Sequence, residues 1–292
     1  MNARLAAWGF VAPAVVVITV FFLLPVAGAL VLSFTDFDLY ALADMRNLRF
    51  VGLANYLHLL ATPLFWQALG NTLYFVLVGV PLSIGVSLGA ALLLNSRLAR
   101  ASAFFRTALF APVVTTLVAV ATIWQYLFHT RYGLLNYTLG MVHVSPVDWL
   151  GDPHWAMPTI ILFAIWKNFG YNMVILMAGL QAIPRELYEA ARIDGASSFR
   201  QFIHVGLPML GPTLSLVSIL TMAGYFQLFA EPYVMTQGGP QQSTLSVLYF
   251  MYNEGFKWWN LGAASAVAFL LFGLIFLCTG ALLRLTRVHG AT

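Results

Sequence analysis

Residues 85–89, Gly-Val-Ser-Leu-Gly, are the place in this sequence where an enzyme motif matches. Serine hydrolases carry their nucleophile in Gly-x-Ser-x-Gly, and Ser87 would need a histidine base within hydrogen-bonding reach. The six histidines all fall in loops or near the ends of apolar runs: His58, His129, His143, His154, His204 and His289. Small residues at this spacing also suit close packing between membrane helices. An intramembrane serine protease is therefore an alternative that the sequence disfavours.

Nucleotide and metal chemistry have no visible site on this chain. The phosphate-binding pattern Gly-x-x-x-x-Gly-Lys-[Ser/Thr] does not occur, and neither Lys167 nor Lys257 follows such a loop. The single cysteine, Cys278, rules out an internal disulfide and a multi-thiolate metal site. We expect no catalytic residue, metal or cofactor here, so any ATP and magnesium must bind to a partner protein.

Composition places most of the chain in lipid. Of its 292 residues, 61% are hydrophobic and only 8% are charged, whereas a soluble domain carries about 25% charged residues. A helix needs about 20 mostly apolar residues to cross a bilayer. The sequence therefore predicts an all-α, polytopic membrane protein with six spans in one domain, residues 1–292: about 8–33, 68–95, 106–130, 156–183, 207–231 and 260–284.

The first span is longer than the apolar core of a secretory signal peptide, so we expect it to be retained. Orientation follows from Lys and Arg, because cytoplasmic flanks are enriched in them. With the N-terminus inside, nine basic residues are cytoplasmic and four external, and Lys167 lies within a span. The nine are Arg4, Arg97, Arg100, Arg106, Arg185, Arg192, Arg200, Arg284 and Arg287; the four are Arg46, Arg49, Arg131 and Lys257. Both termini are then expected in the cytoplasm.

The connection between the fourth and fifth spans, residues 184–206, has helix signals throughout. Pro184 can start a helix, and Asp194-Gly195 can end it with a turn. Ser198 followed by Gln201 has the spacing of a capping box, which predicts a second short helix. Pro208 then marks the entry into the next span. The segment is expected to be a helix, a sharp turn and a second helix at the membrane surface, where the alternative is an ordinary amphipathic loop.

This segment resembles the EAA loop of binding-protein-dependent ABC importer permeases. The matching residues are Glu189, Ala190, Ala191, Asp194, Gly195, Leu207 and Pro208. Val205 stands where that family usually has Ile, which is a mild departure. Gly238-Gly239-Pro240 before the sixth span also resembles the first permease of the paired carbohydrate importers of the maltose and glycerol-phosphate class.

The resemblance implies a type I ABC importer fold in the bacterial inner membrane. It implies a heterodimer with a second permease, an ATP-binding cassette ATPase dimer and an extracytoplasmic solute-binding protein. In such importers the EAA loop forms a coupling helix that docks in a cleft of the ATPase. The seven matching residues would make that contact, and the chain itself would move a sugar or sugar-like solute.

Candidate solute contacts lie on the later spans, because sugars are bound by aromatic faces together with amides and hydroxyls. Asn168, Tyr171 and Asn172 share one face of the fourth span; Ser218, Tyr225, Phe226 and Gln227 are the candidates on the fifth. Packing between helices is the alternative for each. For Lys167 we favour snorkelling or a structural bond, for example to Tyr171, over a pathway role.

An ion-coupled secondary transporter is the remaining alternative. Such carriers usually need acidic groups within the membrane or unwound helices. The sequence places no Asp or Glu in the middle of an expected span, which disfavours that class.

Overall fold

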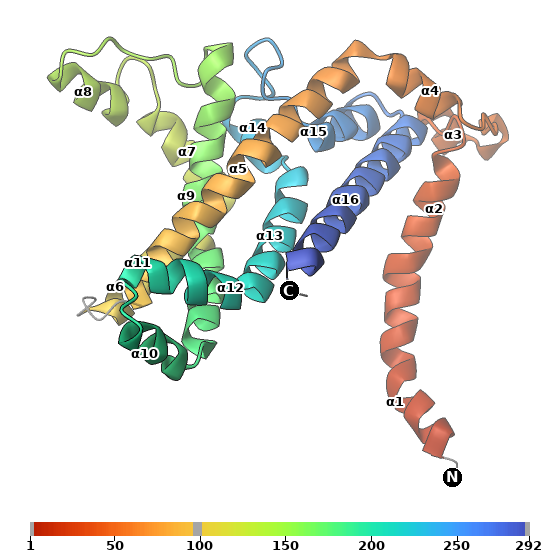
Figure 1. The fold of residues 1–292 in the computed structure, drawn as a ribbon. Coiled ribbons are helices and arrows are strands. Elements are labelled where there is room, and N and C mark those ends of the chain that lie inside the picture. Colours follow the sequence, from red (N-terminus) through yellow and green to blue (C-terminus); the bar gives the residue numbers. More distant parts are fainter. Residues whose placement is uncertain (1–2, 96–100, 290–292) are drawn as a thin grey trace. The chain divides into compact units, whose positions relative to one another are not determined.

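The computed structural model describes residues 3–95 and 101–289, the side chains of 3–7 and 285–289 excepted. Helices dominate this part of the chain, which has no strand beyond one isolated bridge between Thr35 and Phe50. Figure 1 shows their course. In chain order they are α1 (Ala3–Ile18), η1 (Thr19–Leu23), α2 (Leu24–Leu32), α3 (Leu39–Ala43), η2 (Met45–Asn47), α4 (Ala54–Ala61), α5 (Pro63–Asn95), α6 (Ser102–Val114), α7 (Leu117–Leu127), α8 (Leu134–Met141), α9 (Pro153–Ala182), α10 (Arg185–Ile193), α11 (Ser198–Gln201), η3 (Phe202–Gly206), α12 (Leu207–Met209), α13 (Gly211–Phe226), α14 (Ala230–Met235), α15 (Val247–Tyr252), η4 (Asn253–Lys257) and α16 (Leu261–His289). The expected all-α fold class is confirmed.

Four helical stretches in the described residues are long and apolar enough to cross a membrane: Trp8–Leu32, Pro63–Asn95, Pro153–Ala182 and Leu261–Arg284. Two more candidates are bent pairs. Ser102–Val114 meets Leu117–Leu127 at 99°, and Ser198–Met209 meets Gly211–Phe226 at 67°. The count is therefore four, or six if each bent pair is one span. The exact span limits in a bilayer, and which side holds the termini, stay predictions.

The third and fifth expected spans, 106–130 and 207–231, are not continuous helices. In the third, Thr115 and Thr116 are extended, with ψ of 151° and 129°. The Thr115 hydroxyl donates to the Pro112 carbonyl at 2.6 Å, a bond that competes with the helical ladder. In the fifth, a new helix begins at Gly211 with Pro212 in its first turn, where the missing N–H of proline costs nothing.

The chain forms two compact units: residues 1–66 with 250–273, and residues 67–249 with 274–292. In the first unit, the Asn55 amide donates to the carbonyl oxygens of Ser33 and Thr35 at 2.9 and 2.8 Å. The N–H of Gly262, at the start of α16, donates to the Phe37 carbonyl at 2.8 Å, and a Cβ on Gly262 would clash with the Thr35 carbonyl. The loop after α2 is thereby fastened to the start of α16.

In the second unit, α9 packs against α6, α13 and α14. Gly170 permits the approach of α6, because a Cβ there would clash with the Leu109 carbonyl. The buried core around the last turns of α9 comprises Ala91, Met173, Leu176, Met177, Leu180, Ile183, Leu210 and Val217. Figure 1 shows α8 near the beginning of α9 and α10 near its end, so the structured connections of this unit lie at opposite ends of its central helix. Arg97 and Arg100 lie outside the described residues, as does the side chain of Arg287.

Candidate functional site

The segment between α9 and α13, residues 184–208, folds as an elbow. Pro184 precedes α10, and Glu186 lies in its first turn, where an acid favours the positive end of the helix. Gly195 takes φ +79°. The N–H of Gly195 donates to the Arg192 carbonyl and the N–H of Ala196 to the Ala191 carbonyl, at 3.0 and 2.9 Å. These two bonds define a Schellman motif, which explains why glycine ends this helix.

The second helix of the elbow starts one residue earlier than expected. Ser197, and not Ser198, is the N-cap, and its hydroxyl accepts from the Arg200 N–H at 3.4 Å. Ser198 is the first helical residue because the preceding turn leaves only Ser197 extended. Gln201 donates its side-chain amide to the Ala196 carbonyl at 2.8 Å. The hydrogen bond from Gln201 to Ala196 therefore ties the second helix to the turn that precedes it.

The elbow is joined to the core of its unit through Tyr188. This ring packs beside the buried cluster around Ile183 and Leu210, and a Cβ on Gly206 would lie 2.9 Å from its hydroxyl oxygen. Burial raises the pKa of the Tyr188 phenol, since the charged form is disfavoured away from water. α10 thus rests directly on η3, the π-helical turn that leads into α12.

The outer surface of the elbow is mixed in character. Glu189, Ala190, Asp194 and Gly195 are exposed, Ala191 is half-buried, and all five lie on α10 or its turn. Leu207 is half-buried and Pro208 exposed, on α12. Two large apolar side chains also face outward, Ile193 with 87% and Phe199 with 74% of its surface exposed. Acidic, small and apolar groups are therefore available together for contact with another protein.

The second unit also contains a cavity of about 290 Å³ between α5, α6, α9, α13 and α14. Ligand pockets are commonly about 300–1,000 Å³. Five of the sequence candidates line it: Asn168, Tyr171, Asn172, Tyr225 and Gln227. Ser218 is half-buried and Phe226 is buried, and neither is among the lining residues. The remaining lining residues are Phe75, Val113, Ala164, Leu220, Thr221, Gly224, Leu228 and Glu231.

The amides of the cavity are partly committed to the protein. Asn172 donates to the Thr221 hydroxyl at 2.9 Å and fixes α9 against α13. Asn168 donates to the Ala164 carbonyl at 2.9 Å and Gln227 to the Ala223 carbonyl at 3.0 Å. Each amide has two N–H groups and a carbonyl oxygen, so each keeps further hydrogen-bonding capacity that can face a solute.

Of the two alternatives expected for Lys167, snorkelling or a structural bond, the structure has the bond, but not with Tyr171. Its ammonium donates to the Val113 carbonyl at 3.0 Å, and its side chain is only 7% exposed. Val113 is in the last turn of α6, where the break at Thr115 leaves carbonyl groups without helical donors. A cation at a helix C-terminus also suits the helix dipole. Lys167 therefore completes the end of α6.

Glu231 is the one charged residue among the lining residues that were not predicted from the sequence. It was expected at the outer limit of the fifth span, and no acid was expected within the pathway. α13 ends at Phe226, however, and Glu231 lies in the first turn of α14, which packs on α7 and α9. The bent connection brings the carboxylate to the cavity wall. The sequence did contain a signal for this position, because Glu231 ends a long apolar run directly before Pro232.

Ser87 occupies a packing position. Its hydroxyl is fully buried, within hydrogen-bonding distance of the Ser83 carbonyl at 2.6 Å and the Phe169 carbonyl at 3.1 Å. No histidine of the described part of the chain bonds to it. The serine thus contributes to the contact of α5 with α9. Across residues 3–95 and 101–289, the structure also contains no group of three or more His, Cys, Asp or Glu side chains that could hold a metal ion.

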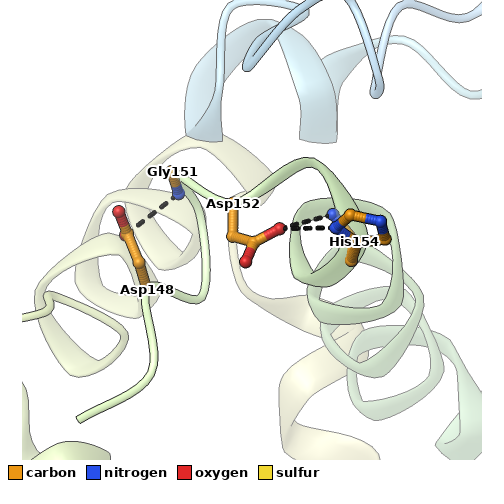
Figure 2. Close-up of polar contacts among 4 residues, drawn as sticks. All are labelled: Asp148, Gly151, Asp152 and His154. Carbon is orange, nitrogen blue, oxygen red and sulfur yellow. Dashed lines mark hydrogen bonds and ion pairs between the residues drawn. The ribbon is translucent and has the colours of Figure 1, made fainter.

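The loop that precedes α9 is built from local carboxylate contacts (Figure 2). Asp148 accepts from the Gly151 N–H at 3.1 Å. Asp152 caps α9, accepting from the His154 N–H at 2.8 Å and lying 3.0 Å from the His154 ring Nδ1. These hydrogen bonds lower the pKa of Asp152, and the bond from the His154 backbone N–H has the larger effect. The loop is therefore ordered at the end of α9 opposite the elbow.

Comparison with known proteins adds a family and a fold. Residues 83–286 match the family described as binding-protein-dependent transport system inner membrane component. The chain is 40% identical, over 269 residues, to the lactose transport system permease protein of Rhizobium radiobacter, covering 90% of this chain and 88% of that protein.

Two solved structures share the fold. One is a bacterial ABC transporter involved in the import of the acidic polysaccharide alginate, with a TM-score of 0.81 and 20% identity over 97% of this chain and 95% of that one. The other is the alginate transporter in complex with an alginate pentasaccharide-bound periplasmic protein, with a TM-score of 0.82 and 19% identity over 98% and 96%.

Proposed function

Because the chain belongs to the inner-membrane components of binding-protein-dependent transport systems, we propose that it is the permease subunit of a carbohydrate importer. It moves a sugar or sugar-like solute that an extracytoplasmic binding protein delivers. A second permease completes the pathway, and an ATPase dimer supplies the energy. The observation that carries this proposal is the 40% identity, over most of both chains, to a lactose transport permease.

The elbow is the ATPase-coupling element in this proposal. Its support is geometric: α10 is ended by a Schellman turn and rests on η3 through Tyr188. A rigid unit of this kind can transmit a displacement of Glu189 or Ala190 to α12 and α13. Exposed Ile193 and Phe199 add apolar surface that a protein cleft can bury. Asp194 and Gly195 make the turn, and Leu207 with Pro208 lead into the span.

The cavity is the solute site in this proposal. Tyr171, Tyr225 and Phe75 offer aromatic surface, and the amides of Asn168, Asn172 and Gln227 offer hydrogen-bonding groups. That combination matches a sugar, which has apolar ring faces and polar edges. Ser218 and Phe226 are not among the lining residues and are no longer proposed as direct contacts. The chain performs no reaction of its own, and ATP with magnesium binds on the partner ATPase.

The test is transport by the reconstituted complex of both permeases, the ATPase and the binding protein. Glu189→Ala is expected to leave insertion intact and to reduce uptake per ATP hydrolysed, because the coupling surface is weakened. Glu186→Ala, on the same helix but outside the matching motif, is the matched comparison. If Glu189→Ala leaves both uptake and ATPase association unchanged, the assignment of the elbow as the coupling element is contradicted.

Energy source separates the importer from an ion-coupled carrier. Vanadate is expected to stop uptake, and a protonophore is expected to have little effect. Orientation is tested with Ile193→Cys in a Cys278→Ser background, in permeases produced without the ATPase that would cover this position: a membrane-impermeant maleimide should label inside-out vesicles only. Labelling of right-side-out cells would place the elbow on the wrong side for an ATPase.

A further inference from the structure

The cavity in the second unit has one acidic side chain among its lining residues and no basic one. The acid is Glu231, in the first turn of α14. All the other lining side chains are apolar, aromatic, amide or hydroxyl groups. The cavity wall therefore presents one charged group to a solute, and that group is acidic. Membership of the family does not by itself specify this charge.

The basic residue beside the lining residue Asn168 is Lys167, which is not itself among the lining residues. Lys167 precedes Asn168 on α9, but its ammonium donates to the Val113 carbonyl and its side chain is almost fully buried. It also interacts electrostatically with Glu231. The ammonium is thus committed to a backbone carbonyl, and Lys167 is not among the residues that line the cavity.

The other polar groups of the wall suit solute hydroxyls. Asn168, Asn172 and Gln227 each donate one N–H to the protein, and no described residue donates to their amide oxygens. Amide oxygens and a carboxylate are acceptors, which suit O–H donors. A phosphate or carboxylate solute brings acceptors only and needs a basic partner.

We infer that the cavity takes an uncharged glycoside, with Glu231 accepting hydrogen bonds from solute hydroxyls, and that it discriminates against anionic sugars. This rests on the proposed function, and it narrows the solute class. The similar proteins do not decide the matter, since one is a lactose system permease and another belongs to an importer of an acidic polysaccharide. A solute anion finds no basic side chain among the lining residues, and beside the Glu231 carboxylate it meets a like charge, which is expected to lower affinity by about tenfold or more.

The experiment measures sugar binding to the purified complex of both permeases and the ATPase, without the binding protein, so that only the membrane site selects. Calorimetric titrations compare lactose and trehalose with lactose 1-phosphate and trehalose 6-phosphate. The wild-type complex is expected to bind at least one neutral sugar, and its phosphorylated form at least about tenfold more weakly. Equal or tighter binding of the phosphorylated form would overturn the inference.

Variants test the assigned residue. Glu231→Gln is expected to weaken binding of the neutral sugar by about tenfold, because a hydrogen bond to a charged group is lost, and to narrow the neutral-to-anionic ratio to about threefold or less. Glu231→Asp keeps the charge and is expected to keep the discrimination. Glu254→Gln, an acid outside the cavity, should change neither affinity. Unchanged affinities in Glu231→Gln would refute the role of this residue.

The outcomes separate the two proposals. If phosphorylated sugars bind best, the solute class is wrong while the carbohydrate importer stands. If neither kind of sugar binds to the complex, and neither kind is taken up by the complete system, the proposed function fails and the inference fails with it. Thermal melting and co-purification of all subunits show whether each variant still assembles, and the wild-type comparison decides the solute class without any variant.

Discussion

Replacing Gly195 tests whether the elbow acts as a rigid unit. Its φ of +79° lies in the left-handed region, and no neighbouring atom lies within 4 Å of the Cβ position. Any effect of substitution therefore comes from backbone strain and not from a clash. An ordinary L-residue in this region costs about 1–2 kcal/mol. Asparagine tolerates it better than alanine, and a β-branched residue tolerates it worst.

That energy gives an expected size for the effect. About 1–2 kcal/mol changes the ratio of formed to unformed elbow by a factor of about 5–30. The order of damage should be Gly195→Val, then Gly195→Ala, then Gly195→Asn. The assays are amide hydrogen exchange over residues 184–208, where protection should fall in that order, and solute-stimulated ATP hydrolysis by the reconstituted complex, which should follow it.

The series can fail in two informative ways. If Gly195→Ala exchanges and hydrolyses like the wild type, the Schellman turn does not limit the elbow. If Gly195→Asn is as damaging as Gly195→Val, backbone conformation is not the cause, and the glycine is needed instead for close approach of a partner surface.

Three further predictions follow from contacts in the structure. Gly206→Ala places a Cβ 2.9 Å from the Tyr188 hydroxyl oxygen, so uptake should fall at equal expression. Tyr188→Phe in the same chain should restore it, whereas Gly211→Ala, with open space around it, should be neutral; no rescue would mean that this contact is not the cause. Lys167→Met removes the donor to the Val113 carbonyl and should destabilise the protein by about 1–3 kcal/mol in thermal melting, since a partly buried acceptor is left unpaired. Lys167→Arg should cost less, and an unchanged melting temperature in Lys167→Met would rule out the capping role. Burial raises the pKa of Glu254, so its protonated form suits the fold better, and stability is lost as pH rises through the folded-state pKa. Glu254→Gln should therefore melt higher than the wild type at pH 7, with the gap in melting temperature closing as pH falls to the ordinary Glu pKa of about 4.3 and below it; a gap independent of pH would contradict this.

Local features of the structure were predictable from the sequence because their causes lie within a few residues. The all-helical class follows from long uncharged runs in a chain with 8% charged residues. The helix and turn at Glu189–Gly195 follow from acids early in the helix and a glycine at its end, and the Schellman bonds span only three to five residues. The cap at Ser197 in place of Ser198 shows the limit of such reasoning, since either serine satisfies the local pattern.

The sequence by itself determined that most of the chain lies in lipid, that the fold is helical, and which residues form the motif of the elbow. Only the tertiary structure decided which polar groups meet. Lys167 reaches a carbonyl 54 residues away, and Asn172 pairs with Thr221 across 49 residues. Glu231 reaches the cavity because the chain bends after Phe226. Periodicity and capping act over one or two helical turns, whereas these meetings depend on where helices break and how closely glycines such as Gly170 let them pack.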